Sequence, residues 1–138
     1  MAILYKEYQD ILGINPKYRT AISSLNEKQL EAYSTIVNLC ANSILHYDEI
    51  KAIPYHEYTF GIGRTKDKSF TCLPFSVRTI NYYGGVSVAG ATMRKLVNLG
   101  LLEKTGKYGD STGYRIPVDL FTTNDLSIKF YNPDIPKF

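Results

Sequence analysis

Apolar residues recur at helical spacing from residue 26 to residue 46, and this is the strongest periodic signal in the chain. They form a single stripe, made of Leu30, Tyr33, Val37, Cys40, Ile44 and Leu45. Asn26 stands at the start of the stretch and Gln29 follows it by three residues, which is the spacing of a capping box. The pattern predicts a long helix with this stripe against the core.

A weaker helical pattern precedes it over residues 3–12. Its apolar positions are Ile3, Leu4, Tyr8, Ile11 and Leu12. Gly13 and Pro16 then interrupt regular structure. We therefore expect a short opening helix.

Beyond the long helix the pattern becomes extended. Alternate apolar residues stand at Tyr58, Phe60 and Ile62, before the charged stretch RTKDK and the run SFTCLPF. Two extended runs around a polar turn predict a strand or a loose hairpin. A second, short helix is expected after Pro74, and it ends at Gly84 and Gly85, where the backbone can take conformations that other residues avoid. Its apolar residues are Phe75, Val77, Ile80 and Tyr83.

A third helix is predicted directly afterwards, with Ser87 as its cap and Gly100 in the glycine position that commonly ends a helix. Its inward face consists of Ala89, Met93, Leu96 and Val97. The runs LLEKTGKY and GYRIPV then alternate as two strands on either side of a GDST tip.

These elements predict a single α+β domain over residues 1–138, a length that is ordinary for one domain. Its core spans about residues 26–118, after an N-terminal extension over residues 1–25 that contains the opening helix. Residues 119–138 have scattered apolar positions and two prolines, so we expect an irregular C-terminal tail that wraps onto the body or packs against a second copy.

Composition narrows the class of protein. A hydrophobic content of 44% excludes the disordered class, and no apolar run approaches the ~18 residues of a membrane span. The N-terminus has no secretory signal pattern, so a cytoplasmic protein is expected.

Cys40 and Cys72 lie far apart, without the close partner of a zinc or redox site, and are expected to be reduced core residues. A net charge of +3 permits a polyanionic partner without requiring one.

The order of elements is helix, strand, helix, tight turn, helix and two-stranded wing. Over residues 26–118 the chain resembles winged helix-turn-helix proteins, and the resemblance is carried by MRKLVNLGLLEKTG followed by YGDSTGYRI. It implies a three-helix core with a β-hairpin wing. In winged-helix DNA-binding proteins the third helix enters the major groove and the wing reaches the neighbouring backbone or minor groove.

The resemblance makes the outward residues of the third helix and the wing candidates for binding double-stranded DNA. On the helix they are Ser87, Gly90, Ala91, Thr92, Arg94 and Lys95. On the wing they are Lys104, Lys107, Tyr108, Ser111, Thr112 and Arg115. Arg94 suits a phosphate or a guanine edge, and Ser87 with the free amides of the helix start suits a phosphate. An adjacent Arg and Lys are equally typical of a solvated helix face.

The small residues Gly90 and Ala91 allow close approach of the backbone but offer no hydrogen-bonding side chain. If this face binds DNA, we expect phosphate and shape recognition with few direct base contacts. Asp110 at the wing tip would face phosphates unless the wing turns it aside.

Several catalytic patterns fail on inspection. The stretch GIGRTKDKS has Asp67 where a phosphate-binding loop needs glycine. Tyr82 and Tyr83 resemble a DNA-nicking pair, but the His-x-His metal motif is missing, since only His46 and His56 are present. We expect one of these tyrosines to be buried and the other exposed. No metal cluster or activated nucleophile has the required spacing. A non-enzymatic protein without a metal or cofactor is expected.

The first functional hypothesis is a DNA-binding transcription regulator, or an accessory factor in DNA replication or mobile-element transfer that marks an origin or transfer site. Such proteins often form dimers, and the helix at 26–46 and the tail are candidate dimer surfaces. Two alternatives remain: a winged-helix adaptor that binds a protein partner in replication or transcription machinery, and a phage- or plasmid-encoded inhibitor of a host complex. The twelve tyrosines suit an interface as well as they suit stacking on bases.

Overall fold

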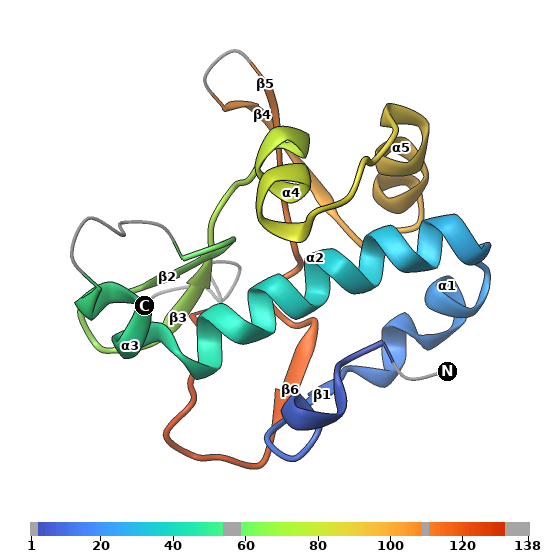
Figure 1. Cartoon of the computed structure of the whole chain (residues 1–138). Coiled ribbons are helices and arrows are strands. Elements are labelled where there is room, and N and C mark those ends of the chain that lie inside the picture. Colours follow the sequence, from blue (N-terminus) through green and yellow to red (C-terminus); the bar gives the residue numbers. More distant parts are fainter. Residues whose placement is uncertain (1–2, 54–58, 109–110, 132–138) are drawn as a thin grey trace, which may run out of the picture.

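The computed structural model describes residues 3–53, 59–108 and 111–131, which form a mixed α+β fold (Figure 1). The helices are η1 (Lys6–Tyr8), η2 (Pro16–Tyr18), α1 (Arg19–Ser23), α2 (Glu27–Leu45), α3 (Tyr47–Ala52), α4 (Val77–Gly84) and α5 (Gly90–Asn98). The strands are β1 (Leu12–Ile14), β2 (Ile62–Arg64), β3 (Phe70–Cys72), β4 (Glu103–Tyr108), β5 (Ser111–Arg115) and β6 (Phe121–Thr123).

The long helix α2 begins where the sequence predicts. The Asn26 side chain accepts a hydrogen bond from the Gln29 amide at 2.9 Å, and the Gln29 side chain accepts one from the Asn26 amide at 3.0 Å. These two bonds complete the predicted capping box and satisfy amides that a helix start otherwise leaves unpaired.

Helix α2 runs through the middle of the molecule (Figure 1). The helices α4 and α5 and the β4–β5 hairpin lie on one side of it, whereas η1, α1 and the β1–β6 pair lie on the other. Its side chains Tyr33, Ile36, Val37 and Cys40 have no exposed surface. Because its own chain covers α2 on both sides, it offers a second copy little apolar surface and is a poor dimer surface.

Among the described residues there are three antiparallel strand pairs, of which two are local hairpins and one is not. Strands β2 and β3 pair from Ile62 opposite Cys72, which confirms the hairpin predicted there, although Tyr58 lies outside the described residues. Strands β4 and β5 form the predicted second hairpin. Strand β1 pairs with β6, with Leu12 opposite Thr123.

An isolated bridge connects the segment before α4 to the β4–β5 hairpin. The Phe75 amide donates to the Tyr114 carbonyl at 2.7 Å, and the Tyr114 amide donates back at 2.8 Å. The Phe75 ring is fully buried and lies 4.7 Å from that of Phe60. The bridge therefore extends the hairpin by a short third segment and anchors it to the core.

The opening helix predicted over residues 3–12 is wrong. Only a single 3-10 turn, Lys6–Tyr8, forms there, and the chain then becomes strand β1. The apolar residues still reach the core, since Ile3 and Leu4 are buried. Pairing with β6 overrides the helical spacing, because an extended partner satisfies the backbone groups of β1.

The tail is less irregular than predicted, because Phe121–Thr123 is a strand and Phe130 forms a bridge with Phe70. Lys17 and Tyr18 join this region to the N-terminal extension through Asp119. Lys17 Nζ lies 2.6 Å from the Asp119 carboxylate, to which the Tyr18 hydroxyl also donates. Residues 3–25 and the first part of the tail thus complete one body; residues 1–2 and 132–138 lie outside the described ranges.

The starts of the second and third helices differ from the predictions. Ser76 caps α4, its hydroxyl accepting from the Thr79 amide at 3.4 Å, so that Phe75 precedes the helix. Helix α5 begins only at Gly90, with Ala89 at the N-cap and no side-chain cap, so Ser87 does not cap it. The end of α5 agrees with the prediction, since Gly100 has a φ of 77°.

The capping difference can be tested by replacing Ser76 with Ala. Loss of the hydroxyl should lower the free energy of unfolding by about 1 kcal/mol, as for other N-caps. Ser87→Ala is the matched control and should change it by less than about 0.5 kcal/mol, because that side chain is exposed and caps nothing. Urea unfolding followed by circular dichroism measures both, and equal losses would contradict the assignment.

The Asp119 contact predicts a pH dependence of stability. Burial alone would raise the pKa of the Asp119 carboxyl, but hydrogen bonds from Lys17 and Tyr18 outweigh it and hold that pKa below its ordinary value. The ion therefore contributes stability above the unfolded-state pKa of ~3.9, and this contribution is lost as the pH falls through the folded-state pKa.

Asp119→Asn should therefore destabilise the protein by about 1 kcal/mol at pH 7, a modest value because the pair is partly exposed, and by less at about pH 3, which lies below the unfolded-state pKa of ~3.9. Asp10→Asn is the control, since Asp10 is exposed and has no ion pair with the residues described. Urea unfolding at both pH values tests this, and an equal loss at pH 7 and pH 3 would rule out the ionic contribution.

Candidate nucleic-acid interface

The candidate interface is built from α5 and the β4–β5 hairpin, with α4 beside them; all three elements lie on one side of α2 (Figure 1). On α5 the side chains of Met93 and Leu96 are fully buried, which sets the rotation of the helix. The opposite face is exposed and consists of Gly90, Ala91, Arg94 and Lys95, with Thr92 half-buried at its edge. This confirms the predicted phase of the helix, except that Ala89 is exposed and not inward.

Ser87 lies in the loop between α4 and α5. The loop is held by the Val88 amide, which donates to the Asn81 side chain at 3.0 Å. Ser87 lines a cleft of about 340 Å³ together with Lys28 and Glu31 of α2. The cleft thus contains one cation and one carboxylate, so its net charge does not favour a phosphate beside Ser87.

The hairpin carries its candidate residues at different distances from its tip. Lys104 and Lys107 are exposed on β4, and Ser111 and Thr112 are half-buried on β5. Arg115 lies at the base, where its Nε donates to the Glu103 carboxylate at 2.6 Å. The predicted contacts of the Tyr108 side chain and of the tip, including Asp110, fall outside the described residues.

The pairing of Arg115 lowers its value as a phosphate contact. Glu103 stands directly opposite Arg115 in the hairpin register, so the two charges neutralise each other locally. Lys104 and Lys107 form no ion pair with any residue that the structure describes. The free positive charge of the hairpin therefore resides on β4.

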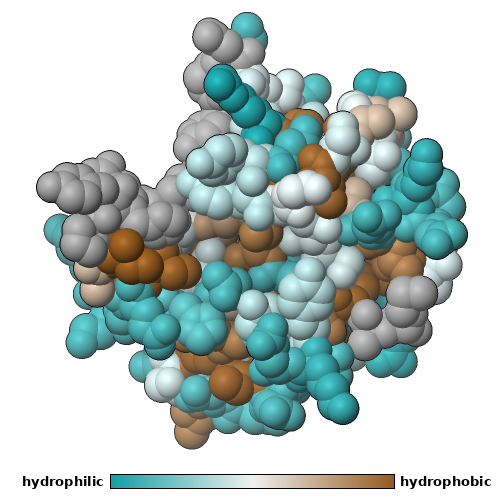
Figure 2. All heavy atoms as spheres, in the orientation of Figure 1, coloured by the Kyte–Doolittle hydropathy of each residue, from teal (hydrophilic) through white to brown (hydrophobic). Residues whose placement is uncertain are grey.

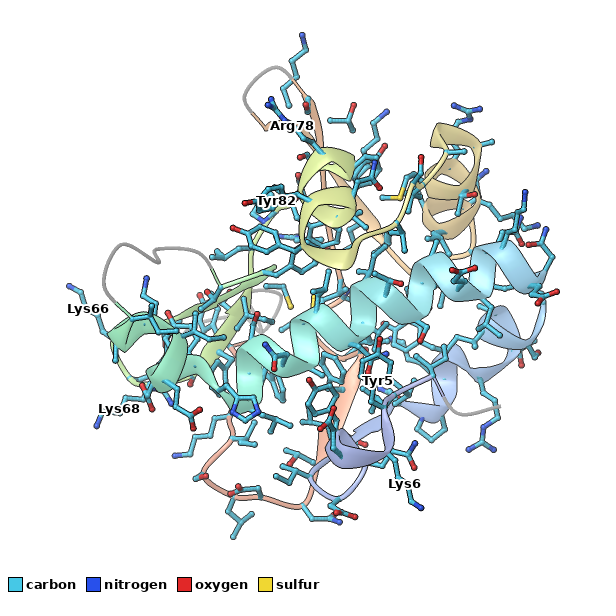
Figure 3. All side chains as sticks on the ribbon, viewed as in Figure 1. Tyr5, Lys6, Lys66, Lys68, Arg78 and Tyr82 are labelled. Atoms are coloured by element: carbon cyan, nitrogen blue, oxygen red, sulfur yellow. The ribbon has the colours of Figure 1, made fainter. Side chains whose placement is uncertain are left out.

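Beside this interface, α4 presents two exposed residues that the sequence prediction did not include. Arg78 and Tyr82 are exposed and project from α4 (Figure 3). They are four residues apart and face away from the buried Ile80, so the helical pattern was consistent with their exposure, but the candidate residues were taken from the third helix and the wing alone.

The prediction that one of the adjacent tyrosines is buried is wrong. Tyr82 is 79% exposed and Tyr83 is 40% exposed. The reason is the close approach of α4 to α2 at Gly84, where an added Cβ would lie 2.5 Å from the Thr35 methyl carbon. With Ile80 and Gly84 facing α2, the two rings are left outside.

Positive charge is concentrated in these elements. Residues 77–115 contain six Lys or Arg and two Asp or Glu, whereas the rest of the chain contains ten and eleven. Figure 2 shows strongly hydrophilic residues along the upper edge of the molecule, over the hairpin and the top of α5. A side with excess positive charge favours approach of a polyanion.

The described residues offer little support for metal binding or for a reactive thiol. They contain no group of three or more His, Cys, Asp or Glu residues that could hold a metal ion. The Nδ1 of His46 lies 3.2 Å from the Glu49 carboxylate, and His56 is outside the described residues. The cysteines are free, and burial raises the pKa of both Cys40 and Cys72, the latter to about 12, so neither is an activated thiol.

The stretch GIGRTKDKS contains strand β2 and the turn that leads to β3, and this turn is held by hydrogen bonds within itself. The Asp67 carboxylate accepts from the Ser69 amide at 3.2 Å and from the Thr65 hydroxyl. Hydrogen bonds from Thr65 and Ser69 lower the pKa of Asp67, so a negative charge occupies the turn. This arrangement agrees with the rejection of a phosphate-binding loop.

On the opposite side of α2 lies a mainly apolar cleft of about 720 Å³. It is formed by η1, β1, η2 and α1 and reaches Leu30 of α2, and Arg19 is the charged residue among those lining it. None of the twelve candidate residues lines this cleft, so it is separate from the candidate interface.

No helix in the described ranges is both long and apolar enough to cross a membrane. Comparison of the chain with protein families, with curated proteins and with solved structures found no match.

Proposed function

We propose that this protein is a non-enzymatic winged-helix protein that binds duplex DNA mainly through phosphate and shape contacts. The observation that carries the proposal is the grouping of the exposed face of α5 with the cationic hairpin on one side of α2. The excess of positive over negative residues in this part of the chain supports a polyanion over the alternative of a protein-binding adaptor.

The order of elements supports the winged-helix assignment. Helix α2 is followed by α4, α5 and the β4–β5 hairpin, as the first, second and third helices and the wing would be. The bridge from Phe75 to Tyr114 lies where the strand before the second helix of such a fold would meet the wing. The β2–β3 hairpin is then an insertion between the first helix and that strand.

In this arrangement α5 would lie in the major groove. Gly90 and Ala91 let its backbone approach closely, while Arg94 and Lys95 contact phosphates on either side of the groove. Lys104 and Lys107 extend the contact along the neighbouring backbone. Few hydrogen-bonding side chains face the base edges, so direct base contacts should add little to sequence preference, and any preference should follow the shape of the DNA.

Such a protein would act in the cytoplasm as a transcription regulator or as an accessory factor at an origin or transfer site. Dimer formation, if it accompanies binding, would use a surface other than α2. Leu126 in the tail is 91% exposed and marks one place where a second copy could pack.

Fluorescence anisotropy with a random-sequence duplex tests the proposal. We expect a Kd of about 1–10 μM at about 50 mM salt and a steep loss of affinity by about 200 mM, since phosphate contacts release counterions. Arg94→Ala should weaken binding about fivefold and flatten the salt slope by about one unit.

Lys68→Ala is the matched control for that substitution. Lys68 is exposed on the β2–β3 turn, far from Arg78 and the candidate interface in Figure 3. Its loss should change affinity by less than about twofold. Equal weakening by both variants would place the DNA elsewhere, and the absence of any binding at low salt would refute the proposed function.

The hairpin allows a separate prediction. Lys107→Ala should reduce the slope of log affinity against log salt by about 0.9, the value for one lost phosphate contact. Arg115→Ala should reduce it less, because Glu103 already neutralises that guanidinium. The comparison uses the same anisotropy titrations, and a larger effect at Arg115 would show that the ion pair opens on DNA.

A further inference from the structure

Helix α4 presents aromatic rings to solvent beside the candidate DNA-binding face. The Tyr82 ring is 79% exposed and meets the Tyr83 ring edge-on, with centroids 4.9 Å apart and planes at 84°. One face of an exposed tyrosine can take up a flat aromatic partner such as a nucleobase.

The backbone position of Tyr82 is fixed by the packing of α4. Ser76 and Thr79 fix the start of α4 through a capping box, and the helix is only eight residues long. Buried Ile80 and the close contact of Gly84 with Thr35 fix its rotation against α2. The exposed ring is therefore held by a helix, which suits a preorganised contact.

One cationic residue, Arg78, lies on the same helix as Tyr82. Arg78 lies four residues earlier, about 6 Å along the helix axis, and forms no ion pair with the described part of the chain. Helix α4 itself contains no acidic residue. In Figure 3 Arg78 lies towards the hairpin and Tyr82 on the outer flank of α4, at the edge of the proposed DNA-binding side.

A ring for stacking beside a free guanidinium matches one kind of ligand, a base together with its phosphate. Bases within a duplex have both faces stacked on their neighbours, so only an unpaired nucleotide can offer a face to Tyr82. A protein partner is a poorer match for this surface. Tyr82 and Tyr83 together expose only on the order of 250 Å², well below the ~800 Å² that each partner buries in an ordinary protein interface.

We propose that Tyr82 stacks on an unpaired base and Arg78 contacts its phosphate, so that the protein favours DNA in which a duplex meets a single strand. This inference rests on the proposed function, with α5 and the hairpin holding the duplex and α4 receiving the strand that leaves it. It narrows the substrate class from duplex DNA to duplex–single-strand junctions.

The test compares three fluorescent probes by anisotropy at fixed salt: a blunt duplex, and the same duplex with a ten-nucleotide tail of either polarity. One tailed probe should bind about tenfold more tightly than the blunt duplex, a gain of ~1.4 kcal/mol. Tyr82→Ala should abolish this gain and leave blunt-duplex affinity unchanged, whereas Tyr82→Phe should retain it, because stacking needs the ring and not the hydroxyl.

Tyr5→Ala is the matched control. Tyr5 is also an exposed tyrosine, 55% accessible, but Figure 3 places it on the other side of α2. This variant should keep the full gain on the tailed probe. A 2-aminopurine base at the first unpaired position gives a second readout. Its fluorescence should be quenched when the wild-type protein binds, and quenched to within twofold of that extent by Tyr82→Phe. Tyr82→Ala should not quench it.

The outcomes separate the two proposals. Salt-sensitive binding of the blunt duplex with no gain from either tail would overturn the junction inference and leave the proposed function intact. A gain that survives in Tyr82→Ala would also overturn it, and would assign the tail to another surface. Failure to bind the blunt duplex at low salt would instead refute the proposed function. Matching urea unfolding curves for the variants exclude misfolding as the cause.

Discussion

The burial of α2 on both sides is the constraint on which the rest of the structure depends. A surface helix buries one stripe, whereas α2 also buries Asn38 and Ser43. These polar groups are satisfied, since the Asn38 amide donates to the Ile3 carbonyl at 3.0 Å and the Ser43 hydroxyl donates to the Leu39 carbonyl at 3.0 Å. The helix can therefore support elements on both flanks without leaving buried donors unpaired.

The two sides of α2 have different roles. On one side Asn38 and its neighbours hold the N-terminal turn, to which the β1–β6 pair brings the C-terminal region. On the other side α4 and α5 pack through small or apolar residues. Gly84 of α4 lies against Thr35 of α2, and Met93 of α5 is buried. Because these contacts fix the rotation of both short helices, they also decide which side chains reach solvent.

The chemistry of the exposed side follows from that geometry. Burying Met93 and Leu96 turns the pair Arg94 and Lys95 outward, and burying Ile80 turns Arg78 outward. On the hairpin, Lys104 and Lys107 of β4 carry positive charge without an ion pair among the described residues. At its base the charge of Arg115 is neutralised by Glu103. The result is a surface with cations at its margins and small residues at its centre, suited to following a phosphate backbone more than to reading base edges.

The local features of this protein were determined by the sequence alone. The cap of α2, its inward stripe, the stop at Gly100 and the outward phase of Arg94 depend on side chains and backbone groups a few residues apart, so periodicity and spacing reveal them. Only the tertiary structure decided the rest. Strand β1 pairs with β6, more than a hundred residues away in sequence, and this pairing replaced the opening helix. That Tyr83 is exposed as well as Tyr82 depended on where α2 lies, which no local pattern specifies.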